Sequence, residues 1–225
     1  MILAFDADDT LWHNESVFQM TEARFADLLA PYCEGSNLAQ RLAATEKRNL
    51  ALYGYGVKGF TLSMIETALE VTEQRVPQPL LADLLHLGRE MLAHPVDLLP
   101  GVEETIESLS ASHTLWIITK GDLFDQERKV AASGLGEHFT QVHIVSEKSA
   151  GTYRRLFGDR PAMMIGNSPR SDILPALEAG ANAVHIPYET TWAHEDAPLP
   201  DHPRLHRLPS VTALPELLRE TFTKP

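Results

Sequence analysis

Five short apolar runs constrain the fold of this chain more than any other feature of its sequence. From the second run onward they alternate with stretches that can form helices. This alternation is typical of a parallel sheet covered by helices. The runs are Ile2–Phe5, Leu115–Ile118, Val142–Val145, Ala162–Ile165 and Ala183–Ile186. We therefore expect an α/β fold with a central parallel sheet.

The interval between the first run and the second predicts an inserted domain. It spans about a hundred residues, which is far too long for one crossover connection. Apolar residues within it keep helical spacing, for example Phe18, Phe25 and Leu28. We predict that residues 14–97 form a separate all-α domain and that residues 1–13 and 98–225 form the core domain.

Charge and cysteine content limit the classes of partner. The chain has 225 residues and a formal net charge of −12. That charge works against binding of a nucleic-acid polymer, which relies on Lys and Arg. The single cysteine, Cys33, cannot form an internal disulfide, and neither a signal peptide nor an apolar membrane span is recognisable. We expect a cytoplasmic protein with no membrane partner.

The last part of the chain, from Pro187, is rich in proline. This composition predicts an irregular surface segment that ends in a short helix near Leu214–Thr221. The histidines of this part fit no zinc-ligand spacing. The residues of this part that could lie near the rim of a site are Thr190, Thr191, Trp192 and His194.

Two carboxylates, Asp6 and Asp8, follow the first apolar run directly. Ligands of parallel sheets gather at the carboxyl ends of the strands, so this pair is expected at the functional edge of the sheet. Neighbouring buried carboxylates repel each other unless a cation or a shared proton relieves them. The pair therefore predicts a bound divalent metal or one raised pKa. An Asp-rich turn that caps a helix is the structural alternative.

Residues suited to anion binding follow the second and third runs. Thr119, Lys120 and Gly121 offer a hydroxyl, backbone N–H groups and a helix N-terminus, which together can hold an anion. Lys148 follows the third run, where an ammonium can reach a transferring phosphoryl group. Taken singly, Thr119–Gly121 could be an ordinary strand-to-helix turn, and Lys148 could be an ordinary surface lysine.

Oxygen ligands follow the fourth run. The loop Gly166–Asp172 can bring Asn167 and Asp172 toward the first strand, where they would suit a hard cation such as Mg²⁺. In isolation this loop is only a helix cap. Chemistry-bearing residues at four successive strand ends are nevertheless not expected by chance.

In this arrangement the chain resembles the haloacid dehalogenase superfamily of phosphohydrolases. Its four motifs occur here in order, as Asp6–Thr10, Thr119, Lys148 and Gly166–Asp172. The helical insertion is similar to the first-position cap of that superfamily. The resemblance implies a Rossmann-like, three-layer core with an inserted cap domain, which would close over the active site and select the substrate.

The resemblance also implies a mechanism, that of a phosphatase that depends on Mg²⁺. Asp6 would be the nucleophile and form an aspartyl-phosphate. Asp8 would be the general acid and base, protonating the leaving group and then activating water. The implied metal ligands are Asp6, the backbone carbonyl of Asp8, Asn167 and Asp172.

The implied substrate-binding residues hold the phosphate. They are Thr10, Thr119, Lys120, Gly121 and Lys148. The substrate itself would be a small phosphorylated metabolite: a nucleotide, a sugar phosphate or a phospho-acid.

Two positions depart from the usual motifs of the superfamily. Asn167 stands where most relatives carry Asp, so we expect weaker Mg²⁺ binding. Lys120 stands where Asn is common, and it could meet a second anionic group of the substrate or pair with Asp122.

Several alternatives stay open at this point. Asp8 argues against a haloacid dehalogenase, because those relatives carry no Asp there. A phosphomutase shares the Asp-x-Asp motif, and a catalytically weak binding or regulatory protein could keep the fold. The role of the segment Tyr53–Gly59 in the cap is undetermined, and the protein could be a monomer or a homodimer.

Overall fold

The computed structural model describes residues 1–33, 37–190, 192 and 194–222, and the chain divides into two compact units. The first unit comprises Met1–Glu15, Val96–Lys120 and Gln126–Pro225, and the second comprises Ser16–Pro95 and Gly121–Asp125. No sequence pattern indicated that residues 121–125 group with the second unit. The domain boundaries expected after residues 13 and 97 stay a prediction.

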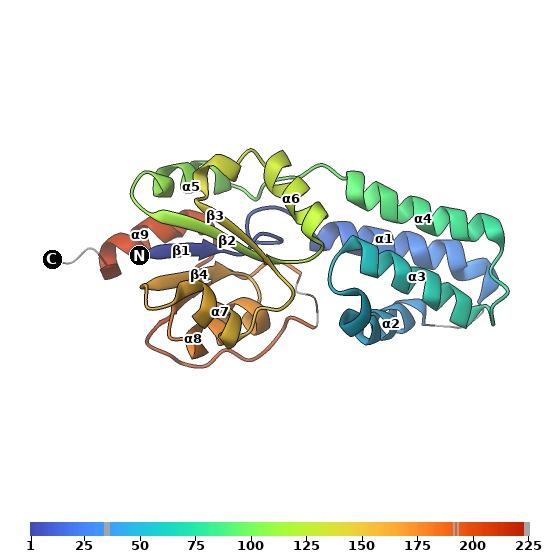
Figure 1. Ribbon diagram of the computed structural model, residues 1–225. Coiled ribbons are helices and arrows are strands. Elements are labelled where there is room, and N and C mark those ends of the chain that lie inside the picture. Colours follow the sequence, from blue (N-terminus) through green and yellow to red (C-terminus); the bar gives the residue numbers. More distant parts are fainter. Residues whose placement is uncertain (34–36, 191, 193, 223–225) are drawn as a thin grey trace. The chain divides into compact units, whose positions relative to one another are not determined.

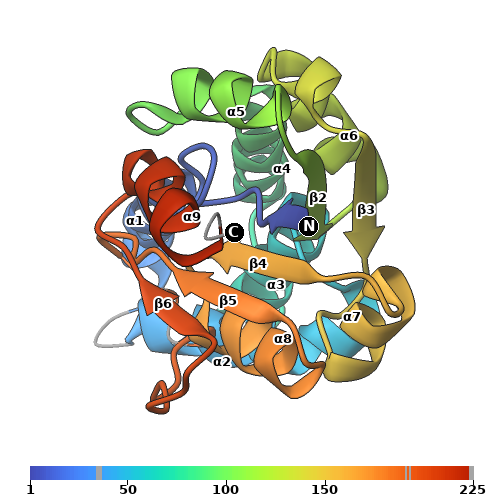
Figure 2. The ribbon, with the colours of Figure 1, turned by 90° about the vertical axis from the view of Figure 1, so that its left-hand side faces the viewer.

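The first unit is built on one six-stranded parallel sheet, in the order β3-β2-β1-β4-β5-β6. Its strands are β1 (Ile2–Phe5), β2 (Thr114–Lys120), β3 (Gln141–Val145), β4 (Ala162–Gly166), β5 (Asn182–His185) and β6 (Leu205–Arg207). The α/β fold expected from the sequence is thus confirmed. Figure 2 shows how the strands lie side by side.

The prediction of irregular structure from Pro187 to the final helix is wrong at one place, because strand β6 lies within this stretch. It has three residues, none of them fully buried, and pairs with β5 in the register Ala183↔Leu205. A strand this short is defined by its partner's backbone, because it carries no apolar pattern of its own.

The register of β1 decides where the first motif lies. Phe5, the last residue of β1, pairs with Ile117 of β2 on one side and with Ile165 of β4 on the other. The backbone N–H of Asp6 then donates to the Ile165 carbonyl at 2.8 Å. The segments that follow β1, β2 and β4 therefore leave the sheet at the same edge.

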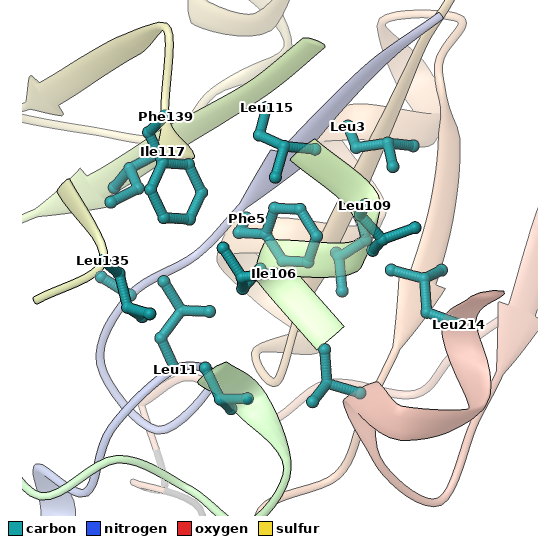
Figure 3. Packing of buried hydrophobic residues seen from close by; sticks show 14 of the residues in the cluster. Leu3, Phe5, Leu11, Ile106, Leu109, Leu115, Ile117, Leu135, Phe139 and Leu214 are labelled. Carbon is teal, nitrogen blue, oxygen red and sulfur yellow. The ribbon is translucent and has the colours of Figure 1, made fainter. Parts of the chain in front are cut away.

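Helices cover both faces of this sheet and make three layers (Figures 1 and 2). They are α5 (Val102–Ser110), α6 (Leu123–Ala132), α7 (Ala150–Phe157), α8 (Leu174–Glu178) and α9 (Leu214–Phe222), with short turns η2 (Gly136–His138), η3 (Pro169–Ile173) and η4 (Val211–Ala213). Side chains alternate along β1, as expected of a buried strand. Leu3 and Phe5 pack with α5 and α9 (Figure 3), whereas Ile2 and Ala4 pack with α7 and α8.

In the described residues of the second unit, all the secondary-structure elements are helices. Its elements are α1 (Glu15–Leu29), η1 (Ala30–Tyr32), α2 (Leu38–Tyr53), α3 (Val57–Val71) and α4 (Gln78–Ala93). Apolar residues at helical spacing form its core, among them Phe25, Leu42, Phe60, Met64 and Leu84. Within the described ranges, none of the helices combines the length and the apolar character that a membrane crossing requires.

The chain leaves and re-enters the first unit along two adjacent segments. His13 N–H donates to the Asp97 carbonyl at 2.9 Å, and Leu99 N–H donates to the Leu11 carbonyl at 3.0 Å. These bonds tie the two ends of the insertion to each other. The loop that carries the first motif is therefore anchored by strand β1 before it and by this crossing after it.

Truncating a side chain of the β1 core should destabilise the first unit. Leu3 is fully buried, so Leu3→Ala should lower the free energy of unfolding by about 2–5 kcal/mol. Val142 on the edge strand β3 is 39% exposed, and Val142→Ala should cost much less. Urea unfolding of both variants tests this, and equal losses would contradict the assignment of Leu3 to the core.

Candidate active site

Lys148 lies between two carboxylates at the common edge of the strands. Its Nζ contacts Asp6 Oδ1 and, at 2.7 Å, Asp172 Oδ1. All three side chains are buried. One ammonium thus faces two carboxylates that come from the ends of β1 and β4, and the local charge is more negative than this lysine alone can neutralise.

This crowding shifts the ionisation of the buried groups. Burial and the charge of Asp172 raise the pKa of Asp6 to about 7, despite the opposing effect of Lys148. Burial by itself would lower the pKa of Lys148, but the two carboxylates outweigh it and raise that pKa above its ordinary value. Of the pair Asp6 and Asp8, it is therefore Asp6 whose pKa is raised.

Thr10 connects the first motif to the loop after β4. Its Oγ1 lies 3.3 Å from Asp6 Oδ2 and 3.2 Å from Asn167 Oδ1, and both of these oxygens are acceptors. A hydroxyl has one proton, so Thr10 can donate to one of them at a time. Asn167 is thereby brought to the same place as Asp6, although 161 residues separate them in the sequence.

Asp8 is oriented by three donors. Trp12 Nε1 donates to its Oδ1 at 2.7 Å, Lys129 Nζ to the same oxygen at 2.9 Å, and Gln126 Nε2 to its Oδ2 at 2.8 Å. Burial would raise the pKa of Asp8, but Lys129 and the hydrogen bonds outweigh it and hold that pKa below its ordinary value. Asp8 is therefore a carboxylate that is held in the charged form.

Gln126 also joins Asp8 to the predicted phosphate-binding loop. The same Nε2 lies 3.3 Å from Thr119 Oγ1 and 2.7 Å from the Lys120 carbonyl oxygen. Asp8 and the hydroxyl of Thr119, which come from neighbouring strands β1 and β2, therefore border one amide group. Gln126 and Lys129 lie three residues apart on α6, and no sequence motif marked them.

Lys120 contacts a carboxylate that the sequence did not suggest as its partner. Its Nζ donates to Glu195 Oε1 at 2.7 Å and to Ser171 Oγ at 2.8 Å. Asp122, the partner considered from the sequence, accepts a bond from Lys58 at 2.8 Å within the second unit. Gly121, predicted to bind phosphate, belongs to that second unit too.

The loop after β4 holds Asp172 tightly. Ser168 N–H donates to Asp172 Oδ2 at 2.9 Å, and Asp172 N–H donates to the Ser168 carbonyl at 2.9 Å. A Cβ atom at Gly166 would lie 2.3 Å from Asp172 Oδ2, a separation that real Cβ atoms do not show. Glycine is therefore required at 166 by the close approach of the Asp172 carboxyl group.

The donors at this edge fit a hard cation. Asp6 and Asp172 converge on the Lys148 ammonium, and Asn167 Oδ1 joins them through Thr10. Oxygen donors with excess negative charge suit Mg²⁺. Within residues 1–33, 37–190, 192 and 194–222, no group of three or more His, Cys, Asp or Glu side chains is arranged to hold a metal. The carboxylate of Asp8 bonds to Gln126 and Lys129 of α6, so the ligand expected from Asp8 stays its backbone carbonyl.

Sequence reasoning missed the part played by Glu195. It considered the neighbouring residues Thr190, Thr191, Trp192 and His194, of which Thr191 lies outside the described residues. The Glu195 carboxylate accepts bonds from Lys120, Ser168 and Ser171. A glutamate in a proline-rich tail carries no local signal of such contacts, because they depend on where the tail crosses the sheet edge.

Comparisons with known proteins agree with this fold. The model of a hydrolase family described as haloacid dehalogenase-like hydrolase matches residues 1–180. A haloacid dehalogenase-like family hydrolase of Xanthomonas campestris is similar at 40% identity and a TM-score of 0.88, over 98% of this chain and 91% of that chain. No curated protein matches the sequence.

Two more distant structures share the fold alone. A HAD-type hydrolase of Bacillus subtilis, solved bound to magnesium, is 18% identical with a TM-score of 0.63, over 96% of this chain and 97% of that chain. A 2-haloacid dehalogenase of Pseudomonas syringae is 23% identical with a TM-score of 0.63, over 97% and 98% of the two chains.

Placing a methyl group at position 166 tests the packing of the site. Gly166→Ala should displace the Asp172 carboxyl group and lower the free energy of unfolding by about 1–3 kcal/mol, the usual cost of overpacking. Gly136→Ala is the matched control, because its added Cβ would meet no atom closer than 3.7 Å. Urea unfolding of the two variants measures the difference, and equal stabilities would contradict the close approach.

Proposed function

We propose that this chain, which belongs to the haloacid dehalogenase-like hydrolase family, is a Mg²⁺-dependent phosphatase that hydrolyses a small phosphate monoester. The family membership makes it a hydrolase. The phosphate ester, the metal and the residue roles below are our proposal.

The observation that carries the proposal is the second carboxylate of the first motif. Asp8 lies beside the Thr119 hydroxyl, since both border the Gln126 amide. An alkoxide that leaves phosphorus needs a proton, whereas a halide leaving carbon needs none. A fixed carboxylate at this place supports phosphoryl transfer over dehalogenation.

In the first step Asp6 attacks phosphorus and the ester oxygen departs. The bond from an Asp6 carboxylate oxygen to phosphorus forms as the bond from phosphorus to the leaving oxygen breaks, and Asp8 supplies the proton to that oxygen. Asp8 must be protonated for this, and the negative charge of a bound phosphate, which raises the pKa of a nearby carboxyl group, would oppose the effect of Lys129 that keeps Asp8 charged in the free protein. Lys148, in contact with Asp6, holds the nucleophile and balances charge on the phosphoryl oxygens. Thr119 and the backbone N–H of Lys120 bind those oxygens.

In the second step water attacks the aspartyl-phosphate and releases Asp6. Asp8 takes a proton from the water, which its charged form can do. The Lys129 ion pair and the bonds from Trp12 and Gln126 keep its carboxylate in one orientation. The same side chain would thus give up a proton in the first half-reaction and take one from water in the second.

Mg²⁺ would be held by Asp6, Asp172, Asn167 and the backbone carbonyl of Asp8. When bound, it would neutralise charge between the Asp6 carboxylate and the incoming phosphate. Asn167 supplies a neutral oxygen where a carboxylate would add charge, so we expect modest affinity. The structure of the distant Bacillus subtilis hydrolase is bound to magnesium, which supports the choice of this metal.

The substrate is proposed to be a small phosphorylated metabolite, with nucleotides, sugar phosphates and phospho-acids as its classes. Lys120 is an unpromising contact for a second anionic group, because Glu195 lies 2.7 Å from its Nζ. A phosphomutase would use the same aspartate pair but would return the phosphoryl group to a second hydroxyl of its substrate. A cytoplasmic location and a monomer or homodimer stay predictions.

Metal removal and loss of the nucleophile should each abolish activity. Phosphate release from an aryl phosphate should stop with chelator and return with Mg²⁺. Asp6→Asn should lose roughly 10³-fold or more in turnover, because it removes the nucleophile itself. The control Asp201→Asn changes an exposed carboxylate and should match the wild type. Metal-independent release of chloride from 2-chloropropionate, with no phosphate release, would instead support the dehalogenase.

The loss of turnover caused by replacing the proton donor should depend on the leaving group of the substrate. Asp8→Asn should cut turnover of alkyl phosphates by roughly 10²-fold or more, the usual scale for general acid catalysis. Aryl phosphates with acidic phenols leave more readily without a proton, so their first step should suffer less. Turnover of a matched alkyl and aryl pair by the wild type and the variant measures this. An Asp8→Asn variant that turns over both substrates as fast as the wild type would exclude the proton-handling role.

A further inference from the structure

Glu195 connects two segments of the candidate site that follow different strands. It lies in the irregular segment between β5 and β6, and its side chain is only 13% exposed. Lys120, after β2, donates to its Oε1 at 2.7 Å. Ser168 and Ser171, in the loop after β4, donate their hydroxyls to its Oε2.

Backbone bonds fix Glu195 against the same loop. Arg170 N–H donates to the Glu195 carbonyl at 3.2 Å, and Ser168 Oγ lies 3.3 Å from that carbonyl oxygen. Arg170 Nη1 donates to the neighbouring His194 carbonyl at 3.2 Å. The contact is therefore between two segments of backbone as well as between side chains.

Ser168 directly precedes η3, and Ser171 lies within η3 next to Asp172. Ser168 Oγ accepts the Ser171 N–H at 2.9 Å and so caps η3, while Ser168 N–H donates to Asp172 Oδ2 at 2.9 Å. A displacement of Ser168 would therefore displace the Asp172 carboxylate. The Glu195 carboxylate bonds to these two serines and acts on Asp172 through them.

The Glu195 carboxylate is charged. Burial would raise its pKa, but Lys120 and the two serine hydroxyls outweigh it and lower that pKa to about 2. A charged acceptor makes stronger hydrogen bonds than a neutral one. The serines are thus held more firmly than an amide at this position could hold them.

We propose that Glu195 is a positioning residue for the metal site: it fixes the Ser168–Ser171 turn and thereby aims Asp172 at the Mg²⁺ position. The inference rests on the proposed function, since it assumes that Asp172 binds the metal. Residues behind metal ligands commonly change metal affinity when they are replaced.

Calorimetric titration of the full chain with Mg²⁺, without substrate, tests this directly. Glu195→Gln keeps the size of the side chain and removes the charge. Its dissociation constant for Mg²⁺ should rise by about 10-fold to 100-fold. Glu189→Gln, at an exposed position of the same segment, should leave the constant unchanged. An unchanged constant in Glu195→Gln would overturn the inference.

A double variant separates positioning from simple neutralisation of Lys120. If Glu195 acts through the serines, Glu195→Gln with Lys120→Met should bind Mg²⁺ as weakly as Glu195→Gln alone. If Glu195 only balances the Lys120 charge, removing both groups should restore wild-type affinity. That restoration would overturn the positioning role.

A milder variant covers the case in which Glu195→Gln fails to fold, which thermal unfolding would reveal. Ser171→Ala removes one donor to Glu195 and keeps the Ser168 cap, so it should weaken Mg²⁺ binding in the same direction but by less. If the double variant Ser168→Ala with Ser171→Ala binds Mg²⁺ with wild-type affinity, the inference is overturned. A wild-type chain that binds no Mg²⁺ would overturn the proposed function instead, and the inference with it.

Discussion

The confinement of two buried carboxylates around one buried ammonium governs the whole of this site. Asp6 and Asp172 both contact Lys148, and all three are removed from water. Buried charges are costly unless they are paired and hydrogen-bonded. The ends of β1, β3 and β4 must therefore meet with little tolerance, and Lys148 has to reach past the end of β2, which lies between β3 and β1 in the sheet.

Groups outside the motifs give each reactive side chain its orientation. Helix α6 supplies Gln126 and Lys129 to Asp8, and the tail supplies Glu195 to the loop of Asp172. Gln126 and Glu195 each contact two segments at once. The site is thus rigid because its elements are tied to one another, and not because any single loop is stiff.

Sequence reasoning predicted the elements whose signal is local. Five apolar runs indicated β1 to β5, and residues just past them indicated Asp6, Asp8, Thr119, Lys148 and the loop of Asp172, which the structure brings to one sheet edge. Strand β6 and the role of Glu195 were not predicted, because a three-residue edge strand and a single glutamate in the tail have no sequence pattern of their own. Their positions are set by distant backbone, which periodicity does not encode.

Lys120 illustrates how the charges depend on one another. The sequence suggested either a substrate anion or Asp122 as its partner, and the structure provides Glu195 instead. Lys129 likewise faces Asp8, and Lys148 faces both Asp6 and Asp172. Each of these lysines already has a carboxylate partner, so a doubly charged phosphate would meet little net attraction from them. A divalent cation beside Asp6 would change that balance, which is a physical reason for the proposed phosphatase to need metal for binding as well as for chemistry.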